Sequence, residues 1–289
     1  ALSQNVLNIE SAAEWLFDEN NRNKCKNIQE SSYYEYDYQK QKDNAIPAEA
    51  KHILAENAPL EDILWWYDEL HSMEVEMEVL ERLKESWDQQ QAIFNDDSPR
   101  SNYGKLMERI LSFRELKYKF VDPYLINHAQ SRLGNVKFEE LNDENSFIRC
   151  AVLGDASGSM EVAIKSSCII ASLLSVALSA DLKFFNSEVF DPPVIPRDVN
   201  ETIEVVNKIS AIGGTCMASA IYPYLQKKIK IDLFILVSDE GENEKYKGQY
   251  FSSLFKTYKN NINPKAQLFL VSFLKVGEEG IIMKRLKDK

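Results

Sequence analysis

The chain has 289 residues and a formal net charge of −11, with 44% hydrophobic and 27% charged residues. This composition is typical of a globular protein long enough for two domains, and it excludes a membrane protein because no apolar run approaches the length of a span. The first residues lack a basic stretch followed by an apolar one, so we expect no secretory signal. The cysteines show no C-x-x-C spacing, which favours free thiols and a cytoplasmic location; they are Cys25, Cys150, Cys168 and Cys216.

The two halves of the chain differ in charge. Residues 1–146 hold 16 Lys and Arg against 29 Asp and Glu, whereas residues 147–289 hold 18 against 16. The hydrophobic pattern changes at the same place, so we expect a boundary near residue 145, with domains at 1–145 and 146–289. The acidic first half argues against a broad nucleic-acid groove there, because phosphate binding needs clustered cations, but a local basic patch remains open.

The pattern of the first half predicts helices. A short amphipathic helix at residues 9–17 precedes the cluster Tyr33–Tyr38, which we interpret as an irregular connection or an edge strand. Further helices are predicted by apolar residues at helical spacing; they cover 47–56, 60–70, 73–94, 106–120 and 123–133, with a loop at 95–101. Short connections favour helical hairpins, and HEAT-like stacking stays open although no repeat period is evident. The apolar face of the 73–94 helix is expected to include Met77, Leu80, Leu83 and Trp87.

From Val136 the pattern turns to short apolar runs that alternate with helices, which is typical of a parallel sheet with crossover helices. Strands are expected at 148–153, 182–185, 188–190, 231–238 and 266–273, and helices at 162–180, 199–210, 217–228 and 246–258. The predicted fold class is α/β, a Rossmann-like open, mainly parallel sheet flanked by helices and preceded by an all-α region. We expect Trp15 and Leu16 of the first half, or else Ile281–Met283, to cover the edge of the last strand.

A polar cluster follows the first of these strands. Asp155, Ser157 and Ser159 lie on the turn between that strand, bounded by Gly154, and a helix. In an open α/β sheet, ligands bind at the carboxyl ends of the strands. One carboxylate and two hydroxyls at alternate positions offer only hard oxygen ligands, which suit Mg²⁺. The alternative interpretation is a serine-rich turn that caps the helix.

This D-x-S-x-S element resembles the metal-ion-dependent adhesion site of von Willebrand factor A domains. Two further stretches match the other parts of that site in order, Gly213-Gly214-Thr215 before a helix and Leu236-Val237-Ser238-Asp239 at the end of a strand. The resemblance covers residues 147–273, nearly half of the chain. It implies a von Willebrand A fold with a bound Mg²⁺, for which Mn²⁺ can substitute.

The resemblance also implies a ligand set. Three hydroxyls bind the metal directly and two carboxylates bind it directly or through water; the residues are Ser157, Ser159, Thr215, Asp155 and Asp239. The run Asp239–Glu244 that begins at the last ligand is acidic at four of its six positions. It could hold a second cation, but we expect a solvated loop.

Two enzymatic alternatives find less support. A serine hydrolase needs a nearby base, yet the histidines His52, His71 and His128 all lie in the first half, and the residues around Ser157 depart from G-x-S-x-G. An Mg²⁺-dependent phosphotransferase with Asp155 as nucleophile would place a carboxylate where this chain has Ser157. Because no phosphate-binding glycine loop occurs either, we expect neither nucleotide binding nor an enzyme.

A metal with few protein ligands keeps coordination positions for water, and a carboxylate of another molecule can displace one of these waters. The resemblance to von Willebrand A domains therefore implies a scaffold whose metal binds an Asp or Glu of a protein partner. The order of a helical region and such a domain is also similar to the Ro autoantigen family, which binds small RNAs. The acidic run is loosely similar to a loop found there. RNA binding is thus the alternative function, although the helical half is short and acidic for a full ring of repeats.

Overall fold

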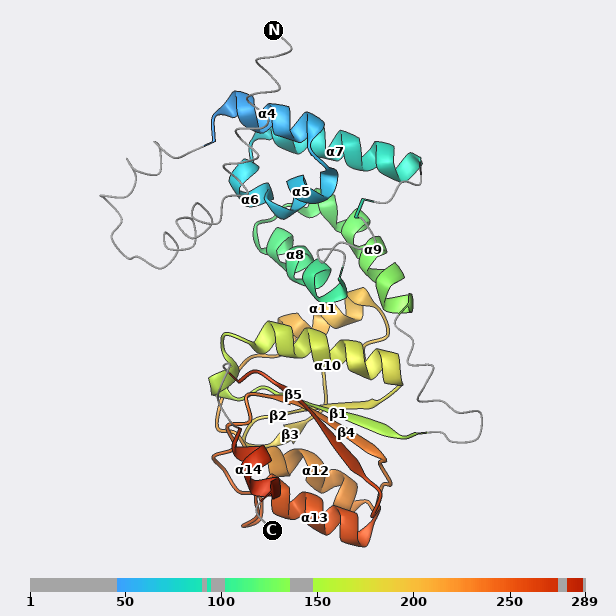
Figure 1. Cartoon of the computed structure of the whole chain (residues 1–289), viewed down its shortest axis with the longest axis vertical. Helices are drawn as coiled ribbons and strands as arrows, with labels where there is room; N and C mark the ends of the chain where they lie inside the picture. Colours follow the sequence, from blue (N-terminus) through green and yellow to red (C-terminus); the bar gives the residue numbers. More distant parts are fainter. Residues whose placement is uncertain (1–45, 90–92, 95–101, 136–147, 275–279, 288–289) are drawn as a thin grey trace, which may run out of the picture. The chain divides into compact units, whose positions relative to one another are not determined.

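A computed structural model of the chain describes residues 46–89, 93–94, 102–135, 148–274 and 280–287 (Figure 1). Four sequence predictions lie outside these residues: the helix at 9–17, the Tyr33–Tyr38 cluster, the loop at 95–101 and the boundary near 145. The chain forms two compact units. One runs to Ser101 and includes Tyr118–Tyr124, and the other comprises Asn102–Lys117 and Leu125–Lys289.

The first unit is helical. Its helices are α4 (Ala48–Asn57), α5 (Leu60–Trp65), α6 (Tyr67–Leu70), α7 (Met73–Asp88) and the 3₁₀ helix η2 (Lys119–Val121). The helix predicted at 60–70 is interrupted because Trp66 leaves the helical conformation, with φ −102° and ψ 21°. The Ser72 hydroxyl caps α7 by accepting a hydrogen bond from Val75 N at 3.2 Å. Arg82 of α7 donates to the Ala58 carbonyl at 2.7 Å, which fastens the end of α4 to α7.

The buried face predicted for α7 is confirmed at Leu83 but is wrong at Met77 and Trp87. The side chains that point inward are Val75, Val79 and Leu83, whereas Met77 is 66% exposed and Trp87 49% exposed. The helix carries apolar residues of its own on more than one side, so their spacing in the sequence could not show which side is buried. The helix also ends at Asp88, six residues before the predicted end.

The second unit contains a five-stranded sheet in the order β3-β2-β1-β4-β5. The strands are β1 (Cys150–Asp155), β2 (Asp181–Phe185), β3 (Val189–Phe190), β4 (Leu233–Ser238) and β5 (Gln267–Ser272). All neighbours are parallel except β2 and β3, which confirms the open, mainly parallel sheet. Strand β1 is buried along its whole length, as its continuous apolar sequence predicts. Gly154 is required there, because a Cβ would lie 2.6 Å from the Phe184 ring.

Helices cover both faces of this sheet. On one face lie α10 (Ile164–Leu178) and α11 (Val199–Lys208), and on the other lie α12 (Met217–Gln226) and α13 (Phe251–Asn261) (Figure 1). The core between the sheet and the second pair is rich in aromatic rings; it includes Tyr224, Phe234, Phe251, Phe255 and Tyr258. Helix α13 begins later than the predicted residue 246, because residues 246–249 form a turn.

Two helices from the first half of the sequence complete this unit. Helix α8 (Tyr103–Glu115) packs against α10, and its Tyr103 hydroxyl lies 3.5 Å from Thr202 Oγ1. Helix α9 (Asp122–Asn135) contributes Gln130, whose side-chain oxygen accepts a hydrogen bond from Val199 N at the start of α11. The change in charge near residue 145 therefore does not separate the residues of the two units.

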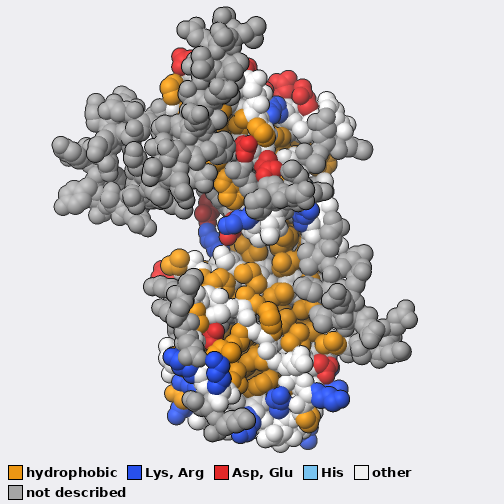
Figure 2. All heavy atoms as spheres, viewed as in Figure 1, with side chains coloured by type: hydrophobic (Ala, Val, Ile, Leu, Met, Phe, Trp, Pro, Cys, Tyr) orange, Lys and Arg blue, Asp and Glu red, His pale blue; other side chains and the backbone are white. Residues whose placement is uncertain are grey.

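Strand β5 forms one edge of the sheet. Its Phe269 is 57% exposed, and Figure 2 shows apolar side chains gathered on this side of the unit. The short helix α14 (Ile281–Lys287) places Ile282 in the same core against which Leu268 and Leu270 pack. Of the two covers expected for this strand, the C-terminal residues reach the core of the unit without being shown at the edge of β5, while Trp15 and Leu16 lie outside the described residues.

The cysteines that the structure describes are buried free thiols, as expected; they are Cys150, Cys168 and Cys216. Burial raises the pKa of the Cys168 thiol to about 12, so this group stays protonated and unreactive. Among the described helices, none has both the length and the apolarity needed to cross a membrane.

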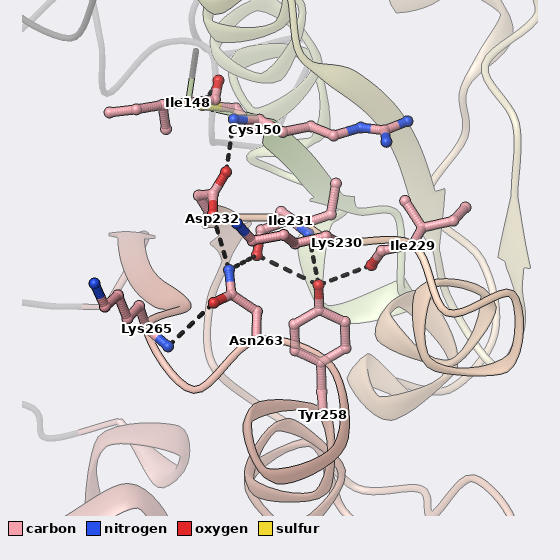
Figure 3. Close-up of polar contacts among 10 residues, drawn as sticks. Ile148, Cys150, Ile229, Lys230, Ile231, Asp232, Tyr258, Asn263 and Lys265 are labelled. Carbon is pink, nitrogen blue, oxygen red and sulfur yellow. Dashed lines mark hydrogen bonds and ion pairs between the residues drawn. The ribbon is translucent and has the colours of Figure 1, made fainter. Parts of the chain in front are cut away.

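A polar cluster fastens the amino-terminal end of the sheet (Figure 3). The Asn263 side chain donates to the Ile231 carbonyl at 3.0 Å and to Asp232 Oδ1 at 2.9 Å, and it accepts from Lys265 N at 3.1 Å. Burial alone would raise the pKa of Asp232, but hydrogen bonds from Arg149 N and Asn263 outweigh it and lower the pKa. The Tyr258 hydroxyl donates to the Ile229 carbonyl at 2.8 Å. These contacts set where β4 and β5 start.

Replacing Asn263 by alanine should lower the free energy of unfolding by about 1–3 kcal/mol, because it removes a buried side chain with hydrogen bonds to the Ile231 carbonyl and to Asp232. Urea denaturation of the full chain measures the effect. Asn260→Ala, at an exposed position of α13, is the matched control and should change little. Equal losses in the two variants would contradict the role given to this cluster.

Candidate functional site

The candidate site lies at the opposite end of the sheet, where the loops after β1 and β4 meet the loop that connects α11 to α12. The loop after β1 is joined to the loop before α12 by two backbone hydrogen bonds, Ile212 N to Ala156 O at 2.9 Å and Gly158 N to Gly213 O at 3.0 Å. The loop before α12 is joined in turn to the loop after β4, because the Asn243 side chain accepts from Thr215 N at 3.0 Å. The structure therefore brings together the three stretches that the sequence singled out.

Asp155 is the central residue of the site. Its carboxylate is fully buried at the end of the middle strand β1. Oδ1 accepts from Ser157 N at 2.9 Å, and Oδ2 accepts from the Ser238 hydroxyl at 2.5 Å. Burial raises the pKa of this carboxyl; the hydrogen bonds from Ser157 and Ser238 oppose the rise, and the nearby charge of Asp239 adds to it. A cation beside Asp155 would offset the cost of this burial.

The two serines of the D-x-S-x-S element lie side by side. Their hydroxyl oxygens are 3.2 Å apart; Ser157 is fully buried, whereas Ser159 is exposed. Gly158 between them allows the close approach of the neighbouring loop, because a Cβ there would lie 3.2 Å from the Gly213 carbonyl. The pair therefore presents two oxygens in a row that leads from the interior to the surface.

Thr215 and Asp239 reach the site from the other two loops. Thr215 is almost fully buried, and its carbonyl accepts hydrogen bonds from Asn243 N and Glu244 N at 3.1 and 3.0 Å. Within the described part of the chain its hydroxyl has no hydrogen-bond partner, so this oxygen is available to a ligand. One carboxylate oxygen of Asp239 accepts from Gly241 N at 2.9 Å, which closes a turn and leaves the other oxygen unused by that bond.

The donor set is poor in the usual metal-binding side chains. The described residues contain no group of three or more His, Cys, Asp or Glu that could hold a metal ion. The cluster consists instead of two carboxylates and three hydroxyls, all of them hard oxygen donors. Any ion held here would complete its coordination with water, which is the usual behaviour of Mg²⁺ in proteins.

The acidic run after β4 is not the solvated loop that we expected. Glu240 and Glu242 are 4% and 2% exposed. Glu242 accepts hydrogen bonds from Ala218 N at 3.2 Å and Phe251 N at 2.9 Å, at the beginnings of α12 and α13, and it pairs with Arg285 at 2.8 Å. Burial raises the pKa of Glu242, although these hydrogen bonds and the arginine oppose the rise.

Sequence reasoning missed two supporting residues. Ser238 lies in the stretch Leu236–Asp239 that resembles part of the metal site, but only the structure shows that its hydroxyl donates to Asp155. A hydroxyl as the last residue of an apolar strand is the signal that could have suggested it. Glu242 offered no such signal, because the groups that it binds lie 9, 24 and 43 residues away.

Comparisons with known proteins give little guidance. No protein-family model matches the chain, and no curated protein matches it in sequence. Among solved structures, the Ro (RSR) protein of Deinococcus radiodurans is similar with 15% sequence identity and a TM-score of 0.42, over 80% of this chain and 54% of that one. This chain thus spans about half the length of that protein. A similarity of this size defines neither the family nor the function of the chain.

Glu242→Ala should lower the free energy of unfolding by about 1–3 kcal/mol, because two helix N-termini and Arg285 lose their acceptor. Thermal melts or denaturant titrations measure the loss. Glu188→Ala, which removes an exposed carboxylate from the same unit, serves as control and should be nearly neutral. If Glu242→Ala were as stable as the control, the loop after β4 would not be held in the way described.

Proposed function

We propose that this protein binds a divalent cation, Mg²⁺ or Mn²⁺, and uses it to hold an acidic side chain of a partner protein. The observation that carries the proposal is the buried Asp155 carboxylate beside two hydroxyls at the carboxyl end of the sheet. The residues that would hold the ion are those that the sequence singled out: Asp155, Ser157, Ser159, Thr215 and Asp239.

The arrangement of these residues fits such an ion. Two neighbouring ligands of an octahedral Mg²⁺, with bonds of about 2.1 Å, lie about 3 Å apart. The hydroxyls of Ser157 and Ser159 are 3.2 Å apart, close to that spacing. Burial and, as a smaller cause, the negative charge of Asp239 raise the pKa of Asp155, and a cation between the loops would stabilise both carboxylates. Hydrogen bonds from neutral groups would not remove the repulsion between the Asp155 and Asp239 carboxylates, whereas a cation would.

The same arrangement favours a bridge to another molecule. The two carboxylates and three hydroxyls provide few charged ligands, so water would fill the remaining positions and a partner carboxylate could replace it. Ser159 is exposed, which places one side of the cluster at the surface. We therefore propose a binding and scaffold role rather than catalysis. RNA is the alternative partner that the sequence suggested.

Calorimetric titration with Mn²⁺ should reveal one weak site, with a dissociation constant of about micromolar to millimolar. Asp155→Ala should abolish the signal, because the variant removes the central carboxylate. Asp191→Ala is the matched control, since it removes an exposed carboxylate that pairs with Lys183, and it should bind Mn²⁺ as the unmodified protein does. Equal heats for Asp155→Ala and the unmodified chain would exclude this metal site.

Bound Mn²⁺ should keep exchangeable water, and a small carboxylate should displace it. Water-proton relaxation of the Mn²⁺-loaded protein measures this, with N-acetylglutamate as the probe and its amide analogue, N-acetylglutamine, as the control. A fall in relaxation with the carboxylate and not with the amide is the expected result.

A parallel titration with single-stranded RNA in EDTA tests the alternative partner. Tight RNA binding that is indifferent to the chelator and falls steeply with salt would favour RNA over a protein partner.

A further inference from the structure

The segment that follows the acidic run forms a rigid hairpin, which we name the basic hairpin (residues 245–250). Tyr246 and Gln249 exchange two backbone hydrogen bonds of 2.9 Å. The two residues between them, Lys247 and Gly248, have φ values of 49° and 80°. Positive φ at both central positions is typical of a tight type I′ turn. The hairpin therefore presents its side chains in a fixed arrangement.

Both lysines of the basic hairpin are held by tyrosine rings. Lys247 Nζ donates to the Tyr222 hydroxyl at 2.6 Å and lies 4.0 Å from the centre of that ring. Lys245 Nζ lies 4.9 Å from the centre of the Tyr250 ring. Because a cation above an aromatic ring is attracted by it, these contacts restrict two side chains that would otherwise be mobile. Positioned cations lose less conformational entropy when they bind an anion.

These two ammonium groups have no acidic partner in the described part of the chain, although both are exposed. Five other lysines of the same unit do have one, in the pairs Lys105–Glu108, Lys165–Glu115, Lys183–Asp191, Lys208–Glu204 and Lys230–Asp232. Arg285 also stacks on Tyr250 but is not available, because it pairs with Glu242. The basic hairpin thus carries two positioned charges without a counterion from the protein.

The basic hairpin lies next to the candidate metal site. Asn243 contacts Thr215 through hydrogen bonds in both directions. Lys245 is two residues further along the chain, so its Cα lies at most about 7 Å from that of Asn243, and the Cα of Lys247 lies within about 14 Å. In an extended peptide, side chains on one face repeat about every 7 Å. A carboxylate on the metal would therefore leave the following acidic side chains within reach of the two lysines.

We propose that the basic hairpin is the second contact of the partner, and that the partner segment is an extended acidic peptide with Asp or Glu at alternate positions. One of its carboxylates binds the metal, and further ones pair with Lys245 and Lys247; this inference rests on the function proposed above. The observations favour a peptide over single-stranded RNA, because cations already lie over the Tyr222 and Tyr250 rings and compete with bases that would stack on them.

Fluorescence anisotropy tests the proposal, with a labelled dodecapeptide of alternating Glu and Gly as the probe and Mn²⁺ in the buffer. The variant Lys245→Ala/Lys247→Ala should weaken binding about three- to thirtyfold, as expected for two exposed ion pairs. Lys245→Glu/Lys247→Glu should weaken it further. The matched control Lys227→Ala/Lys256→Ala removes two exposed lysines elsewhere in the unit and should change the affinity by less than about twofold. Circular dichroism of each variant checks the fold.

The outcomes separate this inference from the proposed function. Loss of peptide binding in Asp155→Ala with no effect of Lys245→Ala/Lys247→Ala would overturn the inference alone. Full peptide binding by Asp155→Ala would overturn the proposed function itself. A single-stranded RNA dodecamer that binds more tightly than the peptide, and loses affinity in the lysine variants, would overturn the assignment to an acidic peptide. Peptide binding that needs Mn²⁺, Asp155 and both lysines would support the proposal.

Discussion

The structure of the second unit depends on how carboxylates are buried at the carboxyl end of the sheet. Asp155, Glu240 and Glu242 are each at most 4% exposed. A buried carboxylate is destabilising unless hydrogen bonds or a positive charge compensate for lost hydration. The chain supplies serine hydroxyls and backbone N–H groups to Asp155, and helix N-termini and an arginine to Glu242. These compensating groups come from the loops after β1 and β4, the starts of α12 and α13, and helix α14, so the same interactions that satisfy the charges hold these segments together.

The segment from Asp239 to Glu244 connects the candidate site to the helices around it. Asp239 and Asn243 lie on the side of the site, through the pKa effect on Asp155 and the hydrogen bond to Thr215. Glu240 and Glu242 face the other way, because Glu240 Oε2 accepts from Met283 N at 3.4 Å and Glu242 pairs with Arg285. Glu240 itself adopts φ 60°, a strained backbone for a non-glycine residue. The loop thus links the start of α12 and α13, and helix α14, to the residues proposed to bind the metal.

The candidate metal site and the basic hairpin are two parts of the surface proposed to bind the partner. A cation at Asp155 would attract a partner carboxylate, and the lysines beside it would select a partner with further negative charge. Such selection is needed here because the rest of the site is acidic and would repel an acidic peptide in the absence of metal. Electrostatic attraction and repulsion of this kind give specificity more than affinity.

The sequence by itself determined the class of fold, the order of strands and helices from β1 to β5, and the residues proposed for the candidate site. It could do so because β1 and β4 are nearly continuous apolar runs and because Asp155 and Asp239 lie at or just after their ends. It could not place the buried face of α7, where apolar residues occur on several sides of one helix. It could not assign α8 to the second unit either, since charge along the chain carries no information about which surfaces pack.

Only the tertiary structure decided the roles of Ser238 and Glu242 and the position of the two lysines of the basic hairpin. Their partners are distant in sequence: Ser238 donates to a residue 83 positions away, and Lys247 to one 25 positions away. Local periodicity reports which side of a helix or strand is apolar, but a hydrogen bond or cation–π contact between loops depends on where the folded chain brings them. For that reason the sequence predicted the chemistry of the site, whereas the structure was needed to show which groups stabilise it and which remain available to a partner.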